Sequence, residues 1–262
     1  MGSVLRWGLA GLKRWGLHLA GAVVFYTCVP LPSHWPFNFK GIARYAPLLG
    51  ILMGLILGGG DWVLMHLGLP IATRSALVVA LWVGLTGGLH LDGAMDTADG
   101  LAVMEPERRL AVMADSHSGA FGVMAAIAIV GLKVLALSEL TQGRGFALMA
   151  VAGWGRWGQV VAIARYPYLK PEGKGAFHQA HARPGVDWLW GGMGLMALGL
   201  AMVTLGNLGW VVTGGTVLGG MGLALGTGSW FHRQLGGHTG DTYGAVVEWT
   251  EALLLCLITA LV

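Results

Sequence analysis

The sequence predicts an all-α protein, a polytopic integral membrane helical bundle, because of its composition and its repeated apolar segments. Of its 262 residues, 55% are hydrophobic and only 11% are charged, whereas soluble domains carry about 25% charged residues. Its 45 glycines favour the close helix–helix contacts found in lipid. We therefore expect a single membrane domain over residues 1–262, with about seven or eight transmembrane helices.

Each segment expected to cross the membrane has close to the 20 or so apolar residues that a spanning helix needs. Seven segments are clear and an eighth, 17–33, is weaker. The clear segments are 44–66, 69–90, 119–141, 145–165, 187–206, 208–230 and 244–262. Residues 1–16 mix apolar residues with Arg6, Lys13 and Arg14, which indicates an amphipathic helix at the membrane interface rather than a signal peptide.

The polar connections predict the orientation. Counting crossings puts four polar segments on one side, namely 34–43, 91–118, 166–186 and 231–243. These segments and their edges hold most of the lysines and arginines, so this side is expected to be cytoplasmic. The site would then face the cytoplasm from the cell (inner) membrane. A crossing at 17–33 would put the basic residues of 1–16 outside, which favours a re-entrant segment there.

Two features limit the function further. Cys28 and Cys256 lie far apart in apolar surroundings, without the spacing of a metal site, and predict no disulfide. The net charge is only +3, and nothing indicates nucleic-acid binding. The sequence leaves open whether the chain forms a homo-oligomer.

The most informative segment runs from Thr86 to Gly122, where acidic residues gather between apolar segments. Of the chain's 13 acidic residues, six lie here: Asp92, Asp96, Asp99, Glu105, Glu107 and Asp115. The first three stand at i, i+4 and i+7, which on a helix places them within an arc of about 60°. Helix capping would explain only the first of them. Carboxylates beside membrane helices indicate a functional site, and Mg²⁺ is the cation that fits them best.

Asp115 begins a second motif, Asp115-Ser116-His117-Ser118-Gly119, directly before an apolar helix. It is a candidate fourth carboxylate of the metal site, beside Asp92, Asp96 and Asp99. A helix N-terminus also suits phosphate. Simple capping by the two serines is the alternative.

Basic residues form a third group. The loop after residue 164 carries Arg165, Lys170 and Lys174 on the same side as the acids, so we expect it to bind phosphate. An ordinary cytoplasmic loop is the alternative. Lys133 and Arg156 lie inside predicted spans, where a charge faces a cavity or an ionic partner.

The fourth group surrounds the last span. Leu235–Thr242 is a glycine-containing turn that leads into a helix with Asp241, Glu248 and Glu251. We interpret these acids as a polar wall facing the acidic helix, since capping accounts only for Asp241. His90 and His238 are the two histidines expected near the chemistry.

Together these groups suit phosphoryl transfer, in which a metal ion and basic side chains offset phosphate charge. The residues expected to bind substrate are Arg108, Arg109, His117, Arg156, Arg165, Lys174, His238, Thr239, Asp241 and Glu248. Asp92, Asp96, Asp99, Asp115 and His90 are the expected catalytic residues.

The motifs resemble those of the cobalamin synthase (adenosylcobinamide-GDP ribazoletransferase) family, in order and over almost the whole chain. They are Gly87-Gly88-Leu89-His90-Leu91-Asp92-Gly93, Asp96-Thr97-Ala98-Asp99-Gly100, Asp115-Ser116 with Gly119, Pro171-Glu172-Gly173 and Gly236-Gly237-His238-Thr239-Gly240-Asp241-Thr242.

The resemblance implies an integral-membrane, Mg²⁺-dependent enzyme of late vitamin B12 assembly. Its substrates would be adenosylcobinamide-GDP and α-ribazole or α-ribazole phosphate, and it would release GMP. The site residues that it implies are Asp92, Asp96, Asp99, Asp115, Asp241 and Glu248. The family commonly has an arginine where this chain has His117, so its role would pass to His117, Arg108 or Arg109.

Two other classes compete. CDP-alcohol phosphatidyltransferases also use membrane aspartates, but their Asp-Gly-x-x-Ala-Arg pattern fails after Asp92-Gly93, where Asp96 and Thr97 follow. A cation or metabolite transporter would carry its acids nearer the middle of the membrane. Asp61, Lys133 and Arg156, which are charged residues within predicted spans, keep that alternative open.

Overall fold

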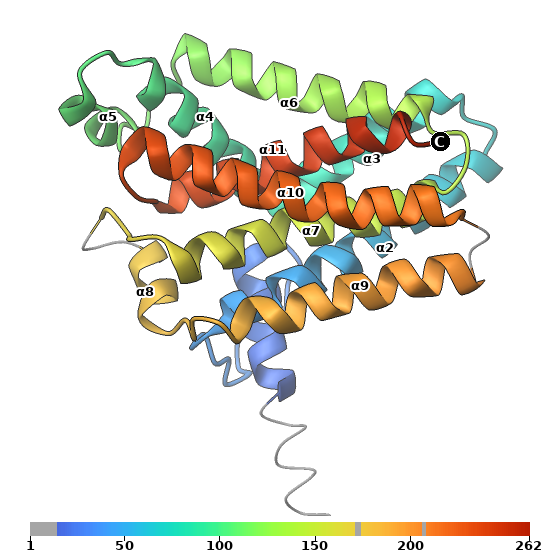
Figure 1. Ribbon diagram of the computed structural model, residues 1–262, viewed down its shortest axis with the longest axis horizontal. Coiled ribbons are helices and arrows are strands. Elements are labelled where there is room, and N and C mark those ends of the chain that lie inside the picture. Colours follow the sequence, from blue (N-terminus) through green and yellow to red (C-terminus); the bar gives the residue numbers. More distant parts are fainter. Residues whose placement is uncertain (1–14, 171–173, 206–207) are drawn as a thin grey trace, which may run out of the picture.

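The computed structural model describes residues 15–170, 174–205 and 208–262, and within these ranges the chain is helical without strands. The long helices lie side by side in Figure 1, with α5 and α8 at one end of the bundle. In chain order the elements are the helix Trp15–Tyr26, η1 (Ile42–Tyr45), α2 (Ala46–His66), α3 (Ile71–Thr86), α4 (Leu89–Ala102), α5 (Pro106–Val112), α6 (Ala120–Glu139), α7 (Arg144–Arg165), α8 (Lys174–Ala180), α9 (Asp187–Leu205), α10 (Trp210–Leu235) and α11 (Gly240–Thr259).

Six of the described helices are long and apolar enough to cross a membrane: α2 with η1, α6, α7, α9, α10 and α11. The bent pair α3 and α4 makes a seventh if it forms one span. This confirms the all-α membrane bundle, with fewer spans than the sequence predicts.

The predicted span 69–90 is wrong as one straight helix. Helix α3 ends at Thr86, and α4 begins at Leu89 after a bend of 89°. Gly87 and Gly88 between them have φ of 60° and 71°, a left-handed conformation that glycine adopts without steric cost. The bend turns the aspartate-bearing α4 away from the direction of α3.

The weaker segment 17–33 is too short to cross as a helix. The described helix Trp15–Tyr26 is about 18 Å long at 1.5 Å per residue, and residues 27–33 are not helical. Of the predicted interfacial helix at 1–16, residues 1–14 lie outside the described part of the chain.

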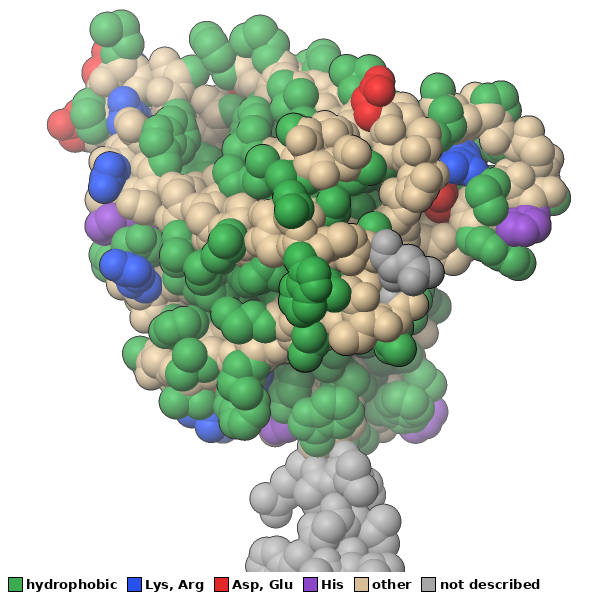
Figure 2. All heavy atoms as spheres, turned by 45° about the vertical axis from the view of Figure 1, so that its right-hand side comes forward, with side chains coloured by type: hydrophobic (Ala, Val, Ile, Leu, Met, Phe, Trp, Pro, Cys, Tyr) green, Lys and Arg blue, Asp and Glu red, His purple; other side chains and the backbone are tan. Residues whose placement is uncertain are grey.

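Helix α7 is the centre of the bundle. Most of its residues are buried, including Trp154, Arg156 and Trp157, and it packs against α2, α9, α10 and α11. Surrounding helices instead expose large apolar side chains, such as Leu55, Ile127 and Leu218. Figure 2 shows hydrophobic side chains and backbone over most of one face, with charged and histidine side chains mainly near its edges. Such a surface suits contact with lipid.

Close approach of α2 to α7 depends on a glycine stripe. Gly50, Gly54 and Gly58 recur at every fourth position of α2 and face the α7 backbone. A Cβ at Gly54 would lie 2.4 Å from the Cα of Met149. This is the small-residue packing that the glycine content predicts.

At the N-terminal end of α7, a buried cluster of one carboxylate and two arginines joins three helices. Arg144 donates through Nε and NH2 to the two carboxylate oxygens of Asp61, at 2.8 and 2.6 Å. Arg74 lies 3.3 Å from the same carboxylate. Asp61 and Arg144 are therefore explained by pairing between α2, α3 and α7, and Asp61 gives no support to a transporter.

The four polar segments lie together at the end of the bundle where α7 finishes, and they were predicted to share one side. We call this the polar end. Arg109 of the segment 91–118 donates to the carbonyl of Gln234 at 3.0 Å, and Arg44 lies 3.7 Å from Asp187 at the start of α9. Tyr168 pairs with His238 through an isolated β-bridge.

We expect Gly54→Ala to destabilise the protein by about 1–3 kcal/mol, because its methyl group would overlap the α7 backbone. Thermal unfolding in nanodiscs, followed by tryptophan fluorescence, measures the effect. Gly59→Ala is the matched control, since a Cβ there meets nothing within 4 Å. Equal midpoints for the two variants would contradict this packing.

Candidate active site

A cavity of about 380 Å³ opens at the polar end, between α4, α8 and the start of α11. We call it the site cavity. It is lined by Phe25, Tyr26, Leu89, His90, Asp92, Gly93, Gln159, Tyr168, Lys170, Gly175, His178, Gly240, Asp241, Tyr243 and Gly244. The segment 166–170 forms one wall because it is held against the α10–α11 turn: Leu169 N donates to His238 O, and His238 N donates to Pro167 O, both at 2.8 Å.

Two glycines bring α4 and α11 together. A Cβ at Gly93 would lie 2.7 Å from the carbonyl oxygen of Asp241, and one at Gly244 would lie 2.8 Å from that of His90. Only glycine permits this approach of two backbones. It places Asp92 and Asp241, distant in sequence, at the same opening.

The mouth of the cavity is its charged, solvent-accessible part, formed by Asp92, Lys170 and Asp241. Lys170 Nζ donates to Asp241 Oδ2 at 3.0 Å, and both side chains are about a quarter exposed. Asp96 lies close enough to interact with the charges of all three. Three carboxylates and one lysine give the mouth an excess of negative charge. The ionised carboxylates repel one another, and a bound cation would relieve that repulsion.

The inner end of the cavity is different, because it carries buried neutral side chains. Tyr26, His90, Gln159, His178 and Tyr243 are each at most 5% exposed. Their polar atoms include several without a hydrogen-bond partner among the described residues. Burial lowers the pKa of His178 to about 4, so its imidazole is neutral at pH 7.

Beneath the inner end, four charges form a buried network of two cations and two carboxylates. Lys133 Nζ donates to Glu248 at 2.7 Å and to Glu251 at 2.6 Å. Arg156 NH1 donates to the other Glu251 oxygen at 2.7 Å. Lys133 also lies 4.4 Å from the ring centroid of Trp82.

This network shows where the structure places the buried charges that the sequence analysis singled out. Glu248 and Arg156, expected to bind substrate, do not line the cavity, and they are bonded within the protein. Lys133 and Arg156 have the ionic partners that charges at that depth require, so they do not mark a transport pathway.

Asp99 has a role that the sequence did not reveal. Its Oδ2 accepts from Gly119 N at 2.7 Å, and its Oδ1 accepts from Gly122 N at 2.8 Å. These amides lie at the N-terminus of α6, where the first N–H groups lack helical partners. Asp99 therefore joins α4 to α6, and it does not line the site cavity.

Asp115 and His117 form an exposed pair rather than part of the cavity. His117 Nδ1 lies 2.6 Å from Asp115 Oδ1. The hydrogen bond lowers the pKa of Asp115 and raises that of His117. The predicted fourth carboxylate thus lies outside the cluster that the structure assembles.

Of the remaining basic residues expected to bind substrate, Arg108, Arg109 and Arg165 do not line the site cavity. Arg108 pairs with Glu105 at the surface, and Arg109 donates to the carbonyls of Val103 and Gln234. Arg165 lines a separate cavity. The side chain of Lys174 lies outside the described residues. Lys170, which the sequence indicated only as part of the basic loop, does reach the acids, because it bonds to Asp241.

His238 and Thr239 stabilise the α10–α11 turn. His238 Nε2 donates to Gly228 O at 3.1 Å, and its Nδ1 lies 3.0 Å from the Thr242 hydroxyl. Burial lowers the pKa of His238 to about 4. Thr239 caps α11, accepting from Thr242 N. Both residues hold the site's wall rather than line it.

The donor set at the mouth fits a hard divalent cation. Carboxylate oxygens are the side-chain ligands that Mg²⁺ prefers, and Mg²⁺ usually takes one or two of them together with phosphates and water. Within the described residues, no three His, Cys, Asp or Glu side chains converge to hold a metal by themselves. A cation here would therefore be shared with a ligand.

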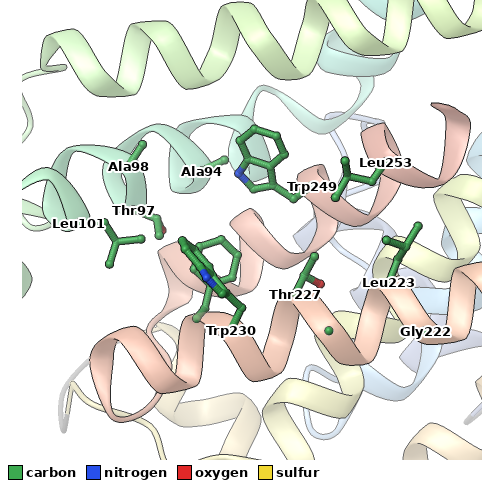
Figure 3. Close-up of a pocket in the computed structure, with 12 residues that line it drawn as sticks. Ala94, Thr97, Ala98, Leu101, Gly222, Leu223, Thr227, Trp230, Trp249 and Leu253 are labelled. Carbon is green, nitrogen blue, oxygen red and sulfur yellow. The ribbon is translucent and has the colours of Figure 1, made fainter. Parts of the chain in front are cut away.

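A second cavity of about 520 Å³ lies on the other side of α4, and it is apolar. Figure 3 shows Ala94, Ala98 and Leu101 of α4 on one side, with Trp230 of α10 and Trp249 of α11 nearby. No charged residue lines it. Although larger, it lacks the groups needed for phosphoryl chemistry, so we place the chemistry in the site cavity.

Sequence reasoning missed the neutral residues of the site cavity. Tyr26 and Gln159 lie in apolar helices with no quoted motif around them, and Tyr243 directly follows the motif that ends at Thr242 but is not part of it. His178 follows the basic loop, which was the one available signal.

Comparison with known proteins identifies the family. The model of the cobalamin-5-phosphate synthase family matches residues 18–259. The chain belongs to this family. It is therefore a transferase, and a multi-pass membrane protein by its helices.

Its relatives cover almost the whole chain. The adenosylcobinamide-GDP ribazoletransferase of Trichormus variabilis is 55% identical over 245 residues, covering 94% of this chain and 97% of its own length. Proteins of the same name from Synechococcus elongatus and Thermosynechococcus vestitus are each 52% identical, covering 93% and 91% of this chain and 96% and 94% of their own lengths. No solved structure matches the chain. The lipid-transferase and transporter alternatives are set aside.

We expect Glu251→Gln to lower stability by about 3–5 kcal/mol, because it leaves Lys133 and Arg156 with one carboxylate between them. The measurement is the thermal midpoint in nanodiscs. Glu139→Gln, at an exposed position of α6, should leave the midpoint unchanged. If both variants melt with the wild type, the network is not needed for folding.

Proposed function

We propose that the enzyme joins adenosylcobinamide-GDP to α-ribazole or its 5′-phosphate, giving adenosylcobalamin or its 5′-phosphate and GMP. The observation that carries this is the mouth of the site cavity, which Asp92, Lys170 and Asp241 line and near which Asp96 interacts with the charges of all three. Relatives named for this activity match the chain almost end to end. We place the enzyme in the cell inner membrane with the mouth facing the cytoplasm, following the positive-inside rule.

Mg²⁺ is the proposed cofactor, held by Asp92 and Asp96, with Asp241 alongside. When bound, it would neutralise charge on the substrate diphosphate and polarise the phosphorus that is attacked. Asp99 is proposed to act indirectly, because its hydrogen bonds to Gly119 N and Gly122 N hold α4 against α6.

Among the described residues, Lys170 is the cation best placed for the phosphates. It is partly exposed at the mouth and bonded only to Asp241 among the described residues. A lysine ammonium acts as a mobile point charge toward phosphate. If the Lys170 ammonium released Asp241 and bonded to a phosphate oxygen instead, its positive charge would still be compensated.

In the proposed reaction, a hydroxyl oxygen of α-ribazole attacks the phosphorus attached to cobinamide. A new P–O bond forms as the bond to the GMP phosphate breaks, and the bonding electrons leave with GMP. A carboxylate at the mouth takes the hydroxyl proton. His90, expected to be catalytic, is buried at the inner end, so a carboxylate of the mouth that does not hold the metal, such as Asp241, is better placed for this role.

The corrin ring must lie outside the site cavity. At about 380 Å³ the cavity is near the lower end of the range for a drug-sized ligand, about 300–1,000 Å³. It can take the nucleotide part of the substrate, while the corrinoid extends toward the membrane face.

Purified enzyme given adenosylcobinamide-GDP and α-ribazole phosphate should release GMP only when Mg²⁺ is present. Cobalamin phosphate should form in equal amount. Chromatographic quantification of both products, with and without EDTA, provides the test. GMP release without cobalamin phosphate would show hydrolysis, and Mg²⁺-independent turnover would remove the metal from the proposal.

Asp96→Asn should lower kcat by about 100-fold or more while the protein stays folded, since a carboxylate essential to the chemistry is lost. Glu107→Gln, an exposed acid of α5, is the matched control with unchanged turnover. Retained activity in Asp96→Asn would contradict the assignment.

Lys170→Met should raise the KM for adenosylcobinamide-GDP by roughly 10-fold, the effect of losing one hydrogen bond to a charged phosphate. The KM for α-ribazole should stay the same. Initial rates with each substrate varied in turn measure both, and equal increases in the two values would argue against a specific phosphate contact.

A further inference from the structure

The inner end of the site cavity has hydrogen-bonding capacity that the described protein does not use. The Tyr26 and Tyr243 hydroxyls, both ring nitrogens of His90 and His178, and Gln159 Oε1 are buried and have no partner among the described residues. All five side chains line the same cavity. Leaving a buried polar group without a partner costs about 1–3 kcal/mol, so their grouping indicates a ligand that satisfies them.

The part of that ligand which lies at the inner end should be uncharged and flat. The imidazole of His178 is neutral at pH 7, and no carboxylate is among the five side chains. Tyr26 lies nearly parallel to His178, at 18° and 6.0 Å between centroids, and nearly parallel to His90, at 16° and 6.3 Å. Parallel aromatic rings around a cavity suit stacking with a planar heterocycle.

The heterocycle must be attached to a phosphate. Asp92 and Lys170 at the mouth line the same cavity as Tyr26 and Gln159 at the inner end. A ligand that fills the cavity therefore meets charged groups at one end and neutral hydrogen-bonding groups at the other. Nucleotides have this distribution of polarity.

We propose that the inner end is a guanine subsite, which binds the base of the GDP carried by the corrinoid substrate. This rests on the proposed function for the identity of the nucleotide. The two substrates offer two flat bases, guanine and the benzimidazole of α-ribazole. The benzimidazole offers a single ring nitrogen for hydrogen bonding, whereas guanine offers donors and acceptors along several edges. Seven unpartnered polar atoms on five side chains fit guanine.

Base selectivity tests the subsite directly. Equilibrium dialysis of labelled GDP and ADP against the enzyme in nanodiscs, with Mg²⁺, should show preference for GDP. Tyr26→Phe and Gln159→Leu should each weaken GDP binding roughly 3- to 10-fold, the effect of one lost hydrogen bond, and should leave ADP binding nearly unchanged. Tyr45→Phe is the matched control, because Tyr45 lines a different cavity.

Kinetics add a second measurement. In the active enzyme, Tyr26→Phe should raise the KM for adenosylcobinamide-GDP and leave the KM for α-ribazole unchanged. A rise confined to the α-ribazole KM would overturn the proposal and assign the inner end to the benzimidazole. Equal binding of GDP and ADP by the wild type would also overturn it.

The two proposals fail separately. Wild-type enzyme without turnover, yet with GDP preference lost in Tyr26→Phe, would leave the subsite standing and remove the reaction. Turnover without any preference between GDP and ADP would support the reaction and remove the guanine subsite.

Discussion

The arrangement of this enzyme depends on pairing charges that are buried in the bundle. Lys133 of α6 and Arg156 of α7 meet Glu248 and Glu251 of α11, so two cations are matched by two carboxylates. An unpaired charge at this depth costs several kcal/mol. The pairing therefore favours a relative placement of the three helices that brings the two cations against the two carboxylates.

That placement determines where the reactive groups lie. Helix α11 contributes Glu251 to the network and Asp241 to the mouth, so the network and the mouth are held by one rigid element. Helix α4 is positioned by close backbone contact with α11 at Gly93 and Gly244, and by Asp99 at the N-terminus of α6. Because of the bend at Gly87 and Gly88, α4 runs in a direction that lets it contact both α11 and α6.

The site cavity separates two kinds of polar group. Charged side chains gather at the partly exposed mouth, where water and a cation can compensate them, and neutral side chains occupy the buried inner end. Burial disfavours the charged form of any titratable group, which explains why His178 is neutral there. The distribution matches a ligand with charge at one end and a flat, hydrogen-bonding ring at the other.

The sequence by itself determined the all-α membrane fold and the common end of the bundle at which the four polar segments lie, and it supplied the hypothesis of chemistry at Asp92, Asp96 and Asp241. These follow from composition, helical length and spacing, which are properties of the chain read in order. Only the tertiary structure decided that Asp99 caps α6, that Glu248 pairs with Lys133, and that Lys170 reaches the mouth. Each depends on contacts between helices far apart in the chain, and local spacing carries no information about them. Apart from His90, the side chains of the neutral inner end could not be recognised in the sequence for the same reason, since an isolated tyrosine or glutamine in an apolar helix gains meaning only from the side chains packed around it.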